Sequence, residues 1–264
     1  MLQLEVLVCT LNSGIKNIAQ HLLPPSPGVS YLISWQQTPK TCPHLLPKEL
    51  ERPDVRVVTL EGHGLSKNRN HALQHAQGDI LLISDDDVLY KEEHFQSIFQ
   101  AFEQYPEANI LTFQIENQTG KPLKKYVPFT FLYEERPKST YFSSLEIAIR
   151  RNFQIPKFNE KFGLGTDYLA CGEEEVFLQK AYNEGAVIRY IPKVIGRTEE
   201  GTTGKRFTTD AKVRHAKGAV LYYLHGYLGA ILRCAKFALQ LPDHRFDFFK
   251  DMFHGIQYAR KINF

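Results

Sequence analysis

Three consecutive aspartates, Asp85, Asp86 and Asp87, follow the apolar run ILLIS without a spacer. Adjacent carboxylates repel one another, so the arrangement is costly unless a cation or several hydrogen-bond donors compensate the charge. Oxygen ligands without a neighbouring Cys or His cluster favour Mg²⁺ or Mn²⁺. Because side chains alternate along an extended backbone, Asp85 and Asp87 are expected to point to one side and Asp86 to the other. The alternative is an exposed acidic turn that caps the following helix.

Polar residues that suit an anionic ligand lie upstream, in the segment GHGLSKNRN. Ser66 stands where the cap of a helix over residues 66–77 is expected, and Arg69 and Asn70 fall in its first turn. A guanidinium is a planar fork for phosphate or a base edge, and a helix N-terminus adds partial positive charge. The segment therefore predicts an anion site, with pairing of Arg69 to one of the aspartates as the alternative.

A second acidic cluster, Glu173, Glu174 and Glu175, lies at the start of a helix expected over residues 174–184. Acidic residues are common in a first helical turn because they interact favourably with the helix dipole. Near a metal site, one of these carboxylates could instead supply the general base that metal-bound aspartates cannot. The residues alone leave both interpretations open.

Alternating apolar runs and helical patterns position these clusters, and they are typical of βαβ units with a mostly parallel sheet. In such sheets, ligands bind at the carboxyl ends of the strands, where the aspartates lie. The turn after the first strand, CTLNSGIKN, lacks the glycine pattern of a nucleotidyltransferase or a Rossmann oxidoreductase. The expected strands are 5–10, 29–35, 55–60, 79–84, 109–115, 126–133 and 186–191, and the expected helices are 14–22, 66–77, 91–105 and 174–184.

In their order, the motifs resemble those of family 2 glycosyltransferases with the GT-A fold. TLN at 10–12 resembles the T-x-N turn, GLSKNRN at 64–70 the GLSxARN-like segment, DDD at 85–87 the D-x-D motif, and GEE at 172–174 the E-D motif. The resemblance covers residues 4 to about 200. It implies one α/β domain of the Rossmann-like GT-A class with a mostly parallel central sheet, and the residues after it predict a C-terminal helical extension.

The resemblance also implies boundaries for the parts of the chain. The GT-A domain would occupy residues 1–203, with a nucleotide-binding half at 1–90 and an acceptor half at 91–203. Outside the resemblance, charge and apolar pattern predict a basic, aromatic-rich helical tail at residues 204–264. From its composition alone, the polar Gly/Thr-rich segment at 196–210 is predicted to be a mobile loop, and closure of residues 196–209 over the donor would exclude water.

The activity implied by the resemblance is inverting transfer of a sugar from a nucleotide-diphosphate donor, expected to be a UDP-sugar, to a hydroxyl of a glycan or lipid-linked acceptor. Glu174 is implied as the base, with Glu173 as its nearest rival, and Asp85 and Asp87 as ligands of Mn²⁺ or Mg²⁺. The donor is implied to contact Thr10, Asn12, Trp35, Gln36, Ser66, Arg69, Asn70, Asp85 and Asp86.

Two departures from the family pattern affect this set of residues. Trp35 and Gln36 stand where many members have an acidic residue that binds the base. The loop VIGRTEEGTTGK, after the strand at 186–191, lacks the histidine that many members have there. A catalytically inactive protein of the same fold that binds nucleotide-sugars is therefore the alternative function.

Composition is that of an ordinary globular protein, because 43% of the 264 residues are hydrophobic and 23% are charged. Disorder, collagen and coiled coil are excluded. The four cysteines form no C-x-x-C pair, and the first residues lack the basic start of a secretory signal. A reducing, cytoplasmic location is expected, and no nucleic-acid partner is expected.

The net charge of +3 is unevenly distributed, because residues 204–264 hold 11 Lys and Arg against 4 Asp. We expect an anionic membrane surface as a partner of this tail, with a basic solvated face as the alternative. Polar residues interrupt its apolar stretch at 219–241, which favours an amphipathic helix over a transmembrane one. The stretch around Tyr222, Tyr223, Leu224 and Tyr227 is predicted to contact the membrane.

Overall fold

The computed structural model describes residues 2–38, 45–138, 140–198 and 203–262. The chain forms two compact units, which are described separately. Unit 1 comprises Met1–His63, Lys67–Lys157 and Lys180–Glu200, and unit 2 comprises Gly64–Ser66, Phe158–Gln179 and Gly201–Phe264.

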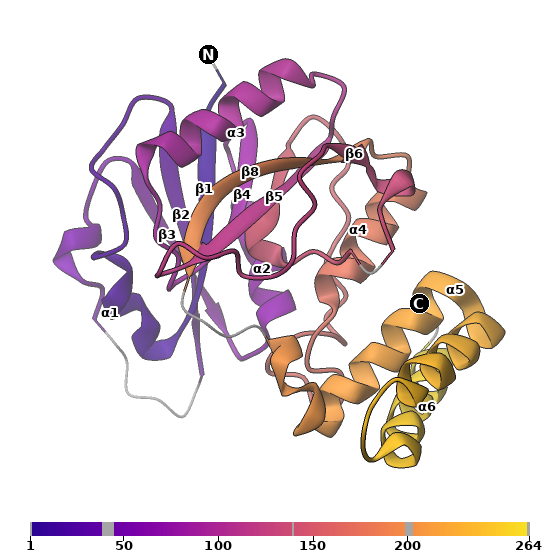
Figure 1. The fold of residues 1–264 in the computed structure, drawn as a ribbon. Coiled ribbons are helices and arrows are strands. Elements are labelled where there is room, and N and C mark those ends of the chain that lie inside the picture. Colours follow the sequence, from indigo (N-terminus) through magenta and orange to yellow (C-terminus); the bar gives the residue numbers. More distant parts are fainter. Residues whose placement is uncertain (1, 39–44, 139, 199–202, 263–264) are drawn as a thin grey trace. The chain divides into compact units, whose positions relative to one another are not determined.

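Unit 1 is built on one eight-stranded sheet, drawn as arrows in Figure 1. Its strands are β1 (Leu4–Leu11), β2 (Val29–Gln37), β3 (Val55–Glu61), β4 (Ile80–Asp85), β5 (Ile110–Asn117), β6 (Phe131–Leu132), β7 (Ile147–Arg150) and β8 (Ile188–Thr198). Their order in the sheet is β3-β2-β1-β4-β7-β5-β8-β6. The first four strands pair in parallel and so do β5 and β8, whereas β7 and β6 run antiparallel to their neighbours. The expected α/β fold with a mostly parallel central sheet is confirmed.

Helices cover both faces of the parallel half of the sheet, which is why its central strands are mostly apolar and almost fully buried. On one face, Phe95 and Phe102 of α3 (Glu92–Gln104) join the main hydrophobic core. The other face is covered by α2 (Leu65–His75). The residues of β2 on either side of Ser34 point into the main core, so Ser34 points to the opposite face, where its hydroxyl lies 2.8 Å from Nδ1 of His71 on α2. Because β1, β2 and β4 are parallel neighbours, their carboxyl ends lie at the same edge of the sheet.

The first four strands lie where the sequence predicts them, but two other predictions are wrong. The helix expected at 14–22 is a short 3-10 turn, η1 (Asn12–Gly14), followed by one turn of α1 (Ile15–Ile18). The strand expected at 126–133 is reduced to the two residues of β6. The remaining 3-10 turns of unit 1 are η2 (Lys48–Leu50), η3 (Tyr133–Glu135) and η4 (Ser144–Glu146).

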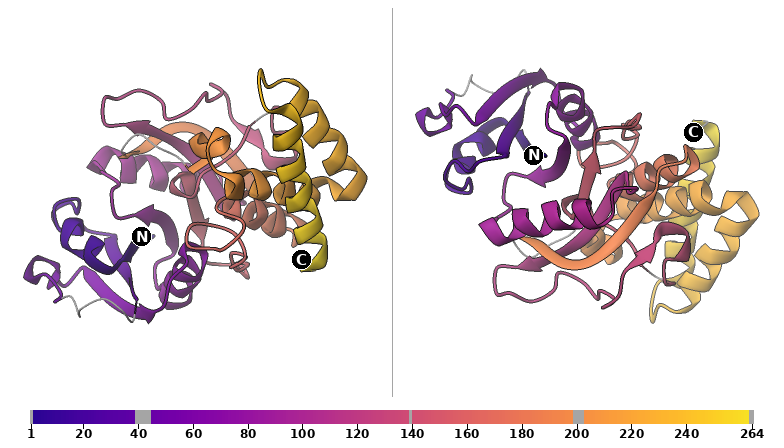
Figure 2. Two further views of the ribbon diagram at one scale, coloured as in Figure 1. Left: turned by 90° about the horizontal axis from the view of Figure 1, so that it is seen from below. Right: turned by 90° about the horizontal axis from the view of Figure 1, so that it is seen from above.

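Unit 2 is dominated by two long helices, α5 (Ala211–Leu239) and α6 (Arg245–Lys261), which pack against each other in both views of Figure 2. Their backbones touch where they cross. A Cβ at Gly218 would lie 1.8 Å from the carbonyl oxygen of Met252, and one at Gly255 would lie 1.9 Å from that of His215. Only glycine fits these two positions, so the crossing point of the helices is fixed by the sequence.

The same tail supports the start of α4 (Glu173–Asn183), the helix of the second acidic cluster. Gly172, immediately before it, has φ +88°, and a Cβ there would lie 2.5 Å from Cγ2 of Val220 on α5. Val176 of α4 shares a hydrophobic cluster with Ala216 and Val220. The tail is therefore part of a packed core that holds the acidic helix.

No helix in the described part of the chain is both long enough and apolar enough to cross a membrane. α5 bends at Gly226, where φ is 68° and ψ is −178°, so its apolar stretch is not one straight segment.

Candidate functional site

The three aspartates lie at the carboxyl end of β4, beside the end of β1 in the sheet. Cys9 is the register partner of Asp85, and the hydroxyl of Thr10, the next residue along β1, donates a hydrogen bond to Oδ2 of Asp86. Gly14 makes this contact possible, because a Cβ there would lie 2.3 Å from Oδ2 of Asp86. The parallel strands thus bring the first and third motifs of the sequence together.

The aspartate carboxylates are held by three different parts of unit 1. Asp85 accepts from Arg69 on α2 at 3.2 Å, Asp86 from Thr10, and Asp87 from the hydroxyl of Thr198 at the end of β8 at 2.9 Å. The strand ends at Asp85, so the alternation expected for Asp85 and Asp87 does not extend along the motif. The pKa values of Asp86 and Asp87 are raised, chiefly because burial disfavours their charged forms.

Arg69 is 2% exposed and is fixed on both sides. Its guanidinium donates to Asp85 and, at 2.6 Å, to the hydroxyl of Ser144 in η4. Pairing with an aspartate, the alternative stated for Arg69, is therefore what the structure contains, and contact of Arg69 with a donor stays a prediction. The immediate effect of the pair is to hold Asp85 in one orientation.

The turn that bears Ser144 is anchored by a buried ion pair. Glu146 is fully buried, and its Oε1 accepts from Lys124 at 2.8 Å and from the hydroxyls of Tyr126 and Ser143, each at 2.9 Å. Its Oε2 accepts from Lys124 at 2.9 Å. Satisfying both carboxylate oxygens in this way offsets the cost of burying the charge. Ser144 thus reaches Arg69 from a rigid support.

The turn after β1 is shaped by Asn12, which has φ +49°, a left-handed conformation that asparagine tolerates. Its Oδ1 accepts from the backbone N–H of Thr38 at 2.9 Å, and its carbonyl accepts from the indole N–H of Trp35 at 2.8 Å. Trp35 is buried in the main core, so stacking of its ring on a donor stays a prediction. Asn70 is half-buried on α2.

Two buried polar atoms at this edge have no hydrogen-bond partner among the residues that the structure describes. They are Nε2 of Gln36, next to the end of β2, and Oδ1 of Asn68 on α2. The other amide atom of Asn68, Nδ2, donates to the carbonyl of Thr10 at 3.0 Å. Buried polar groups are nearly always satisfied in working proteins, so a ligand or water is expected to supply the missing partners.

Glu173 and Ser66 belong to unit 2, where they lie against the same glycine. A Cβ at Gly163 would lie 3.0 Å from the hydroxyl of Ser66 and 3.2 Å from the carboxyl carbon of Glu173. Ser66 donates to the carbonyl of Phe162 at 2.6 Å, and α2 begins at Leu65, so its prediction as the helix cap is wrong. Glu173 is buried, whereas Glu174 and Glu175 are half-buried.

The Gly/Thr-rich segment differs from the loop that the sequence predicts. Gly196 to Thr198 continue β8, and residues 203–208 form the 3-10 turn η5 (Thr203–Thr208). Residues 199–202 lie outside the described residues, and closure of the segment over a donor stays a prediction. Its first half has a definite role in unit 1, because Thr198 holds Asp87.

Four residues that shape the candidate site were not predicted from the sequence: Gly14, Asn68, Ser144 and Thr198. Gly14 and Asn68 had a signal in the sequence, because each lies close to a predicted site residue. Gly14 lies in the turn after Thr10, and Asn68 directly precedes Arg69. Ser144 and Thr198 had none, because each contacts a partner far along the chain. The aspartates belong to unit 1, and Glu173 and Glu174 to unit 2.

Comparison with known proteins gives a match to one family model over part of the chain, and a fold. Residues 37–160 match the model of glycosyl transferase family 2. The sequence has no match among curated proteins.

Among solved structures, the chain is similar to TarS from S. aureus. The crystal structure of TarS 1-349 in complex with UDP-GlcNAc has a TM-score of 0.62 and 17% sequence identity, and the match covers 95% of this chain and 79% of that one. The complex of TarS 1-349 with UDP has a TM-score of 0.57 and 17% identity, covering 98% and 87%. A longer TarS chain, of which 43% is covered, has a TM-score of 0.54 and 16% identity. At such identities the likeness establishes the fold.

Proposed function

The chain is a family 2 glycosyltransferase with the GT-A fold, and on that premise we propose that it transfers a sugar from a UDP-sugar to a hydroxyl group of a glycan or lipid-linked acceptor. The observation that carries the proposal is the convergence of Asp85, Asp86 and Asp87 with Thr10 at the carboxyl ends of adjacent parallel strands. Donors bind at such edges in doubly wound sheets. The similarity to TarS in complex with UDP-GlcNAc and with UDP supports a uridine diphosphate donor.

The residues of unit 1 would orient the donor before any chemistry begins. Arg69 fixes Asp85 for contact with the ribose, and the Asn12 turn borders the nucleotide. The unpartnered atoms of Gln36 and Asn68 offer one hydrogen-bond donor and one hydrogen-bond acceptor, which is the pattern that the edge of a nucleobase needs. Because these groups sit on strands and a helix, little freedom is lost when the donor binds.

The oxygen ligands at the carboxyl end of β4 suit a hard divalent cation. Asp85 and Asp87 are each bound to the protein through one carboxylate oxygen, and a carboxylate held in this way can coordinate through its second oxygen. When bound, Mg²⁺ or Mn²⁺ would stabilise the charge that develops on the diphosphate as it leaves. The raised pKa of Asp87 fits the same assignment, because a nearby cation would offset the cost of burying its charge.

The acceptor hydroxyl must lose a proton as its oxygen attacks the sugar from the side opposite the diphosphate. We assign this proton to the carboxylate of Glu174, in the first turn of α4, which makes the reaction a direct, inverting displacement. Glu173 is buried against Gly163 and Ser66, a position that suits support of the turn or hydrogen bonding to the acceptor. Glu174, which is half-buried, keeps access to a substrate.

The proposal is tested by incubating the full chain with a panel of sugar nucleotides and Mn²⁺ and measuring release of the nucleoside diphosphate. We expect one UDP-sugar to be consumed faster than the others, with consumption lost in EDTA. Tight, metal-dependent binding of UDP without consumption of any sugar nucleotide, with and without candidate acceptors, would instead support the inactive binding protein. Neither binding nor consumption would contradict both functions.

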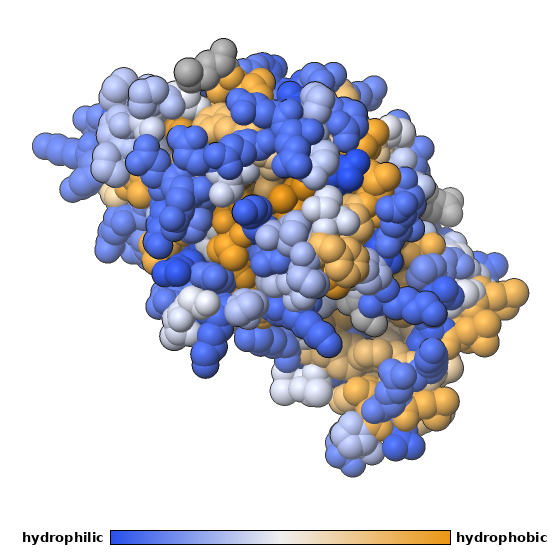
Figure 3. All heavy atoms as spheres, turned by 45° about the horizontal axis from the view of Figure 1, so that its top comes forward, coloured by the Kyte–Doolittle hydropathy of each residue, from blue (hydrophilic) through white to orange (hydrophobic). Residues whose placement is uncertain are grey.

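We further propose that unit 2 attaches to an anionic membrane surface, as suits a lipid-linked acceptor. Exposed apolar side chains on α5 fall on one helical face, with Leu228 75%, Leu232 70% and Leu239 68% exposed. Exposed Arg233 and Lys236 lie among them in the sequence, and Figure 3 displays hydrophobic and hydrophilic residues side by side over the two tail helices. Such a face binds anionic lipid headgroups while its leucines enter the interface.

The residues that first suggested membrane contact have another role in the structure. Tyr222, Tyr223 and Leu224 are partly buried against the hydrophobic cluster that includes Ala219, and Tyr227 packs in the cluster of Met252. They are packing residues of unit 2, and the exposed leucines further along α5 carry the membrane proposal in their place.

Flotation with liposomes is expected to recover the wild-type chain with anionic vesicles at low salt and much less with neutral vesicles. The double variant Leu228→Ser/Leu232→Ser should lose most of this recovery, since two exposed apolar anchors are removed. Leu45→Ser is the matched control, because Leu45 is 88% exposed but lies outside the tail. Equal recovery of both variants would contradict the proposal, and so would a change from dimer to monomer in the double variant, which would assign the face to a second copy of the chain.

A further inference from the structure

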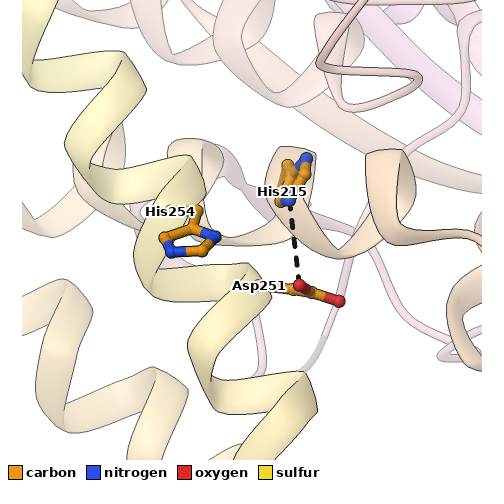
Figure 4. A group of neighbouring side chains, drawn as sticks. All are labelled: His215, Asp251 and His254. Atoms are coloured by element: carbon orange, nitrogen blue, oxygen red, sulfur yellow. Dashed lines mark ion pairs between the residues drawn. The ribbon is translucent and has the colours of Figure 1, made fainter.

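Three metal-ligating side chains of unit 2 face one another where α5 and α6 cross: His215, Asp251 and His254 (Figure 4). One ligand atom from each residue lies within 4.8 Å of the others, and Nε2 of His215 is 3.9 Å from Oδ1 of Asp251. We propose that this group binds Zn²⁺ and thereby joins the two helices. The site uses none of the residues assigned to the donor, the acceptor or the Mg²⁺ or Mn²⁺ ion.

The geometry is close to that of a bound ion. In tetrahedral zinc sites the metal lies about 2.0–2.2 Å from its nitrogen and oxygen ligands, which places the ligand atoms roughly 3.5 Å from one another. The three atoms here therefore need shifts of about an ångström or less, within the reach of small side-chain rotations. Asp251 and His254 are three residues apart on α6, so they project from the same face of the helix.

Two of the three ligands are already fixed in orientation by neighbouring groups. The ring of Tyr168 stacks on His215, with centroids 4.2 Å apart and planes 14° apart. Nε of Arg214 donates to Oδ2 of Asp251 at 2.7 Å, so that Oδ1 is the oxygen nearer His215. Outer contacts of this kind orient the ligands of many metal sites and strengthen binding.

The helix crossing itself keeps the ligands together. Gly255, the residue after His254, lies directly against the backbone of His215, where a Cβ would be 1.9 Å from the carbonyl oxygen. Because no side chain separates the two backbones, the spacing of the three ligands does not depend on flexible packing. This fixed crossing distinguishes the group from a chance gathering of polar residues on a surface.

The ligand types select the metal. Two imidazoles and one carboxylate suit Zn²⁺, whereas Mg²⁺ and Ca²⁺ prefer oxygen ligands throughout. His215 and Asp251 are half-buried and His254 is exposed, so the ion has a path of entry and a fourth position for water. Since Val220 of α5 also packs on Gly172, a metal that joins α5 to α6 would stabilise the core that holds the start of α4.

The test is a titration of the metal-free full chain with ZnCl₂ by calorimetry, together with its melting temperature. We expect one tight site per chain and a higher melting temperature with Zn²⁺. His254→Ala should weaken binding by about 100-fold or more, because one of only three protein ligands is removed. The matched control is His225→Ala, since His225 is exposed on α5 outside the group.

A second pair of variants separates this site from the aspartates of β4. Asp87→Ala should leave Zn²⁺ binding unchanged, whereas His254→Ala should leave Mn²⁺-dependent binding of UDP unchanged. The proposal would be overturned if wild-type protein bound no Zn²⁺, or if His254→Ala bound it as tightly as wild type. Loss of Zn²⁺ binding in Asp87→Ala would also overturn it, because the metal would then be bound by the aspartates.

Discussion

Glu174→Gln is expected to lower the turnover number by about 10²–10⁴-fold while donor affinity stays nearly unchanged. The amide keeps the size and shape of the side chain, but it cannot accept the proton that the acceptor hydroxyl must lose. Glu174 is half-buried in the first turn of α4, and glutamine has nearly the same size, so the substitution should not unfold the chain. The measurements are steady-state kinetics with a consumed donor and its acceptor, and donor binding by calorimetry.

The neighbouring glutamates give this prediction its controls. Glu175→Gln should stay close to wild type, because successive helix positions point about 100° apart and the three carboxylates cannot share one role. Glu173→Gln should keep the packing against Gly163 and lower activity less than Glu174→Gln. If Glu173→Gln is inactive while Glu174→Gln stays within about tenfold of wild type, the base is Glu173 and the assignment is one residue too late.

The parallel half of the fold could be predicted because its signals are local. β1, β2 and β4 are rich in apolar residues, which reflects burial on both faces of a parallel sheet. β7 escaped prediction because it has only four residues, and its place between β4 and β5 depends on pairing with distant strands. The helix expected at 14–22 was predicted too long, since the chain forms only the single α-helical turn of α1 there.

In the candidate site, too, the residues with a local signal were predicted and those that depend on distant contacts were not. The aspartates and Thr10 were found because each lies at the end of a recognisable strand. The supports of the site were not: Ser144 reaches Arg69 from 75 positions away, and Thr198 reaches Asp87 from 111. A hydrogen bond between distant segments leaves no pattern in the neighbouring sequence, so only the folded chain reveals which residues hold the carboxylates in place.

Asp87→Ala is expected to abolish metal-dependent binding of UDP, and with it sugar transfer, while the fold remains intact. The substitution removes a carboxylate assigned to the cation, and it breaks the hydrogen bond from Thr198, which contributes about 1 kcal/mol to stability. Loss of that bond is offset in part, because burying the charged carboxylate is itself unfavourable, as its raised pKa indicates. The measurements are UDP binding by calorimetry with and without Mn²⁺, and thermal unfolding without ligand.

Two further variants separate the lost charge from the lost hydrogen bond. Asp87→Asn keeps an oxygen that can accept from Thr198 but removes the negative charge, so we expect wild-type stability and no Mn²⁺-dependent binding. Thr198→Val removes only the hydrogen bond, so Asp87 keeps its charge and binding should weaken far less than in Asp87→Asn. If Asp87→Asn binds UDP and Mn²⁺ as tightly as the wild-type chain does, Asp87 holds β8 in place through Thr198 and is not a ligand of the cation.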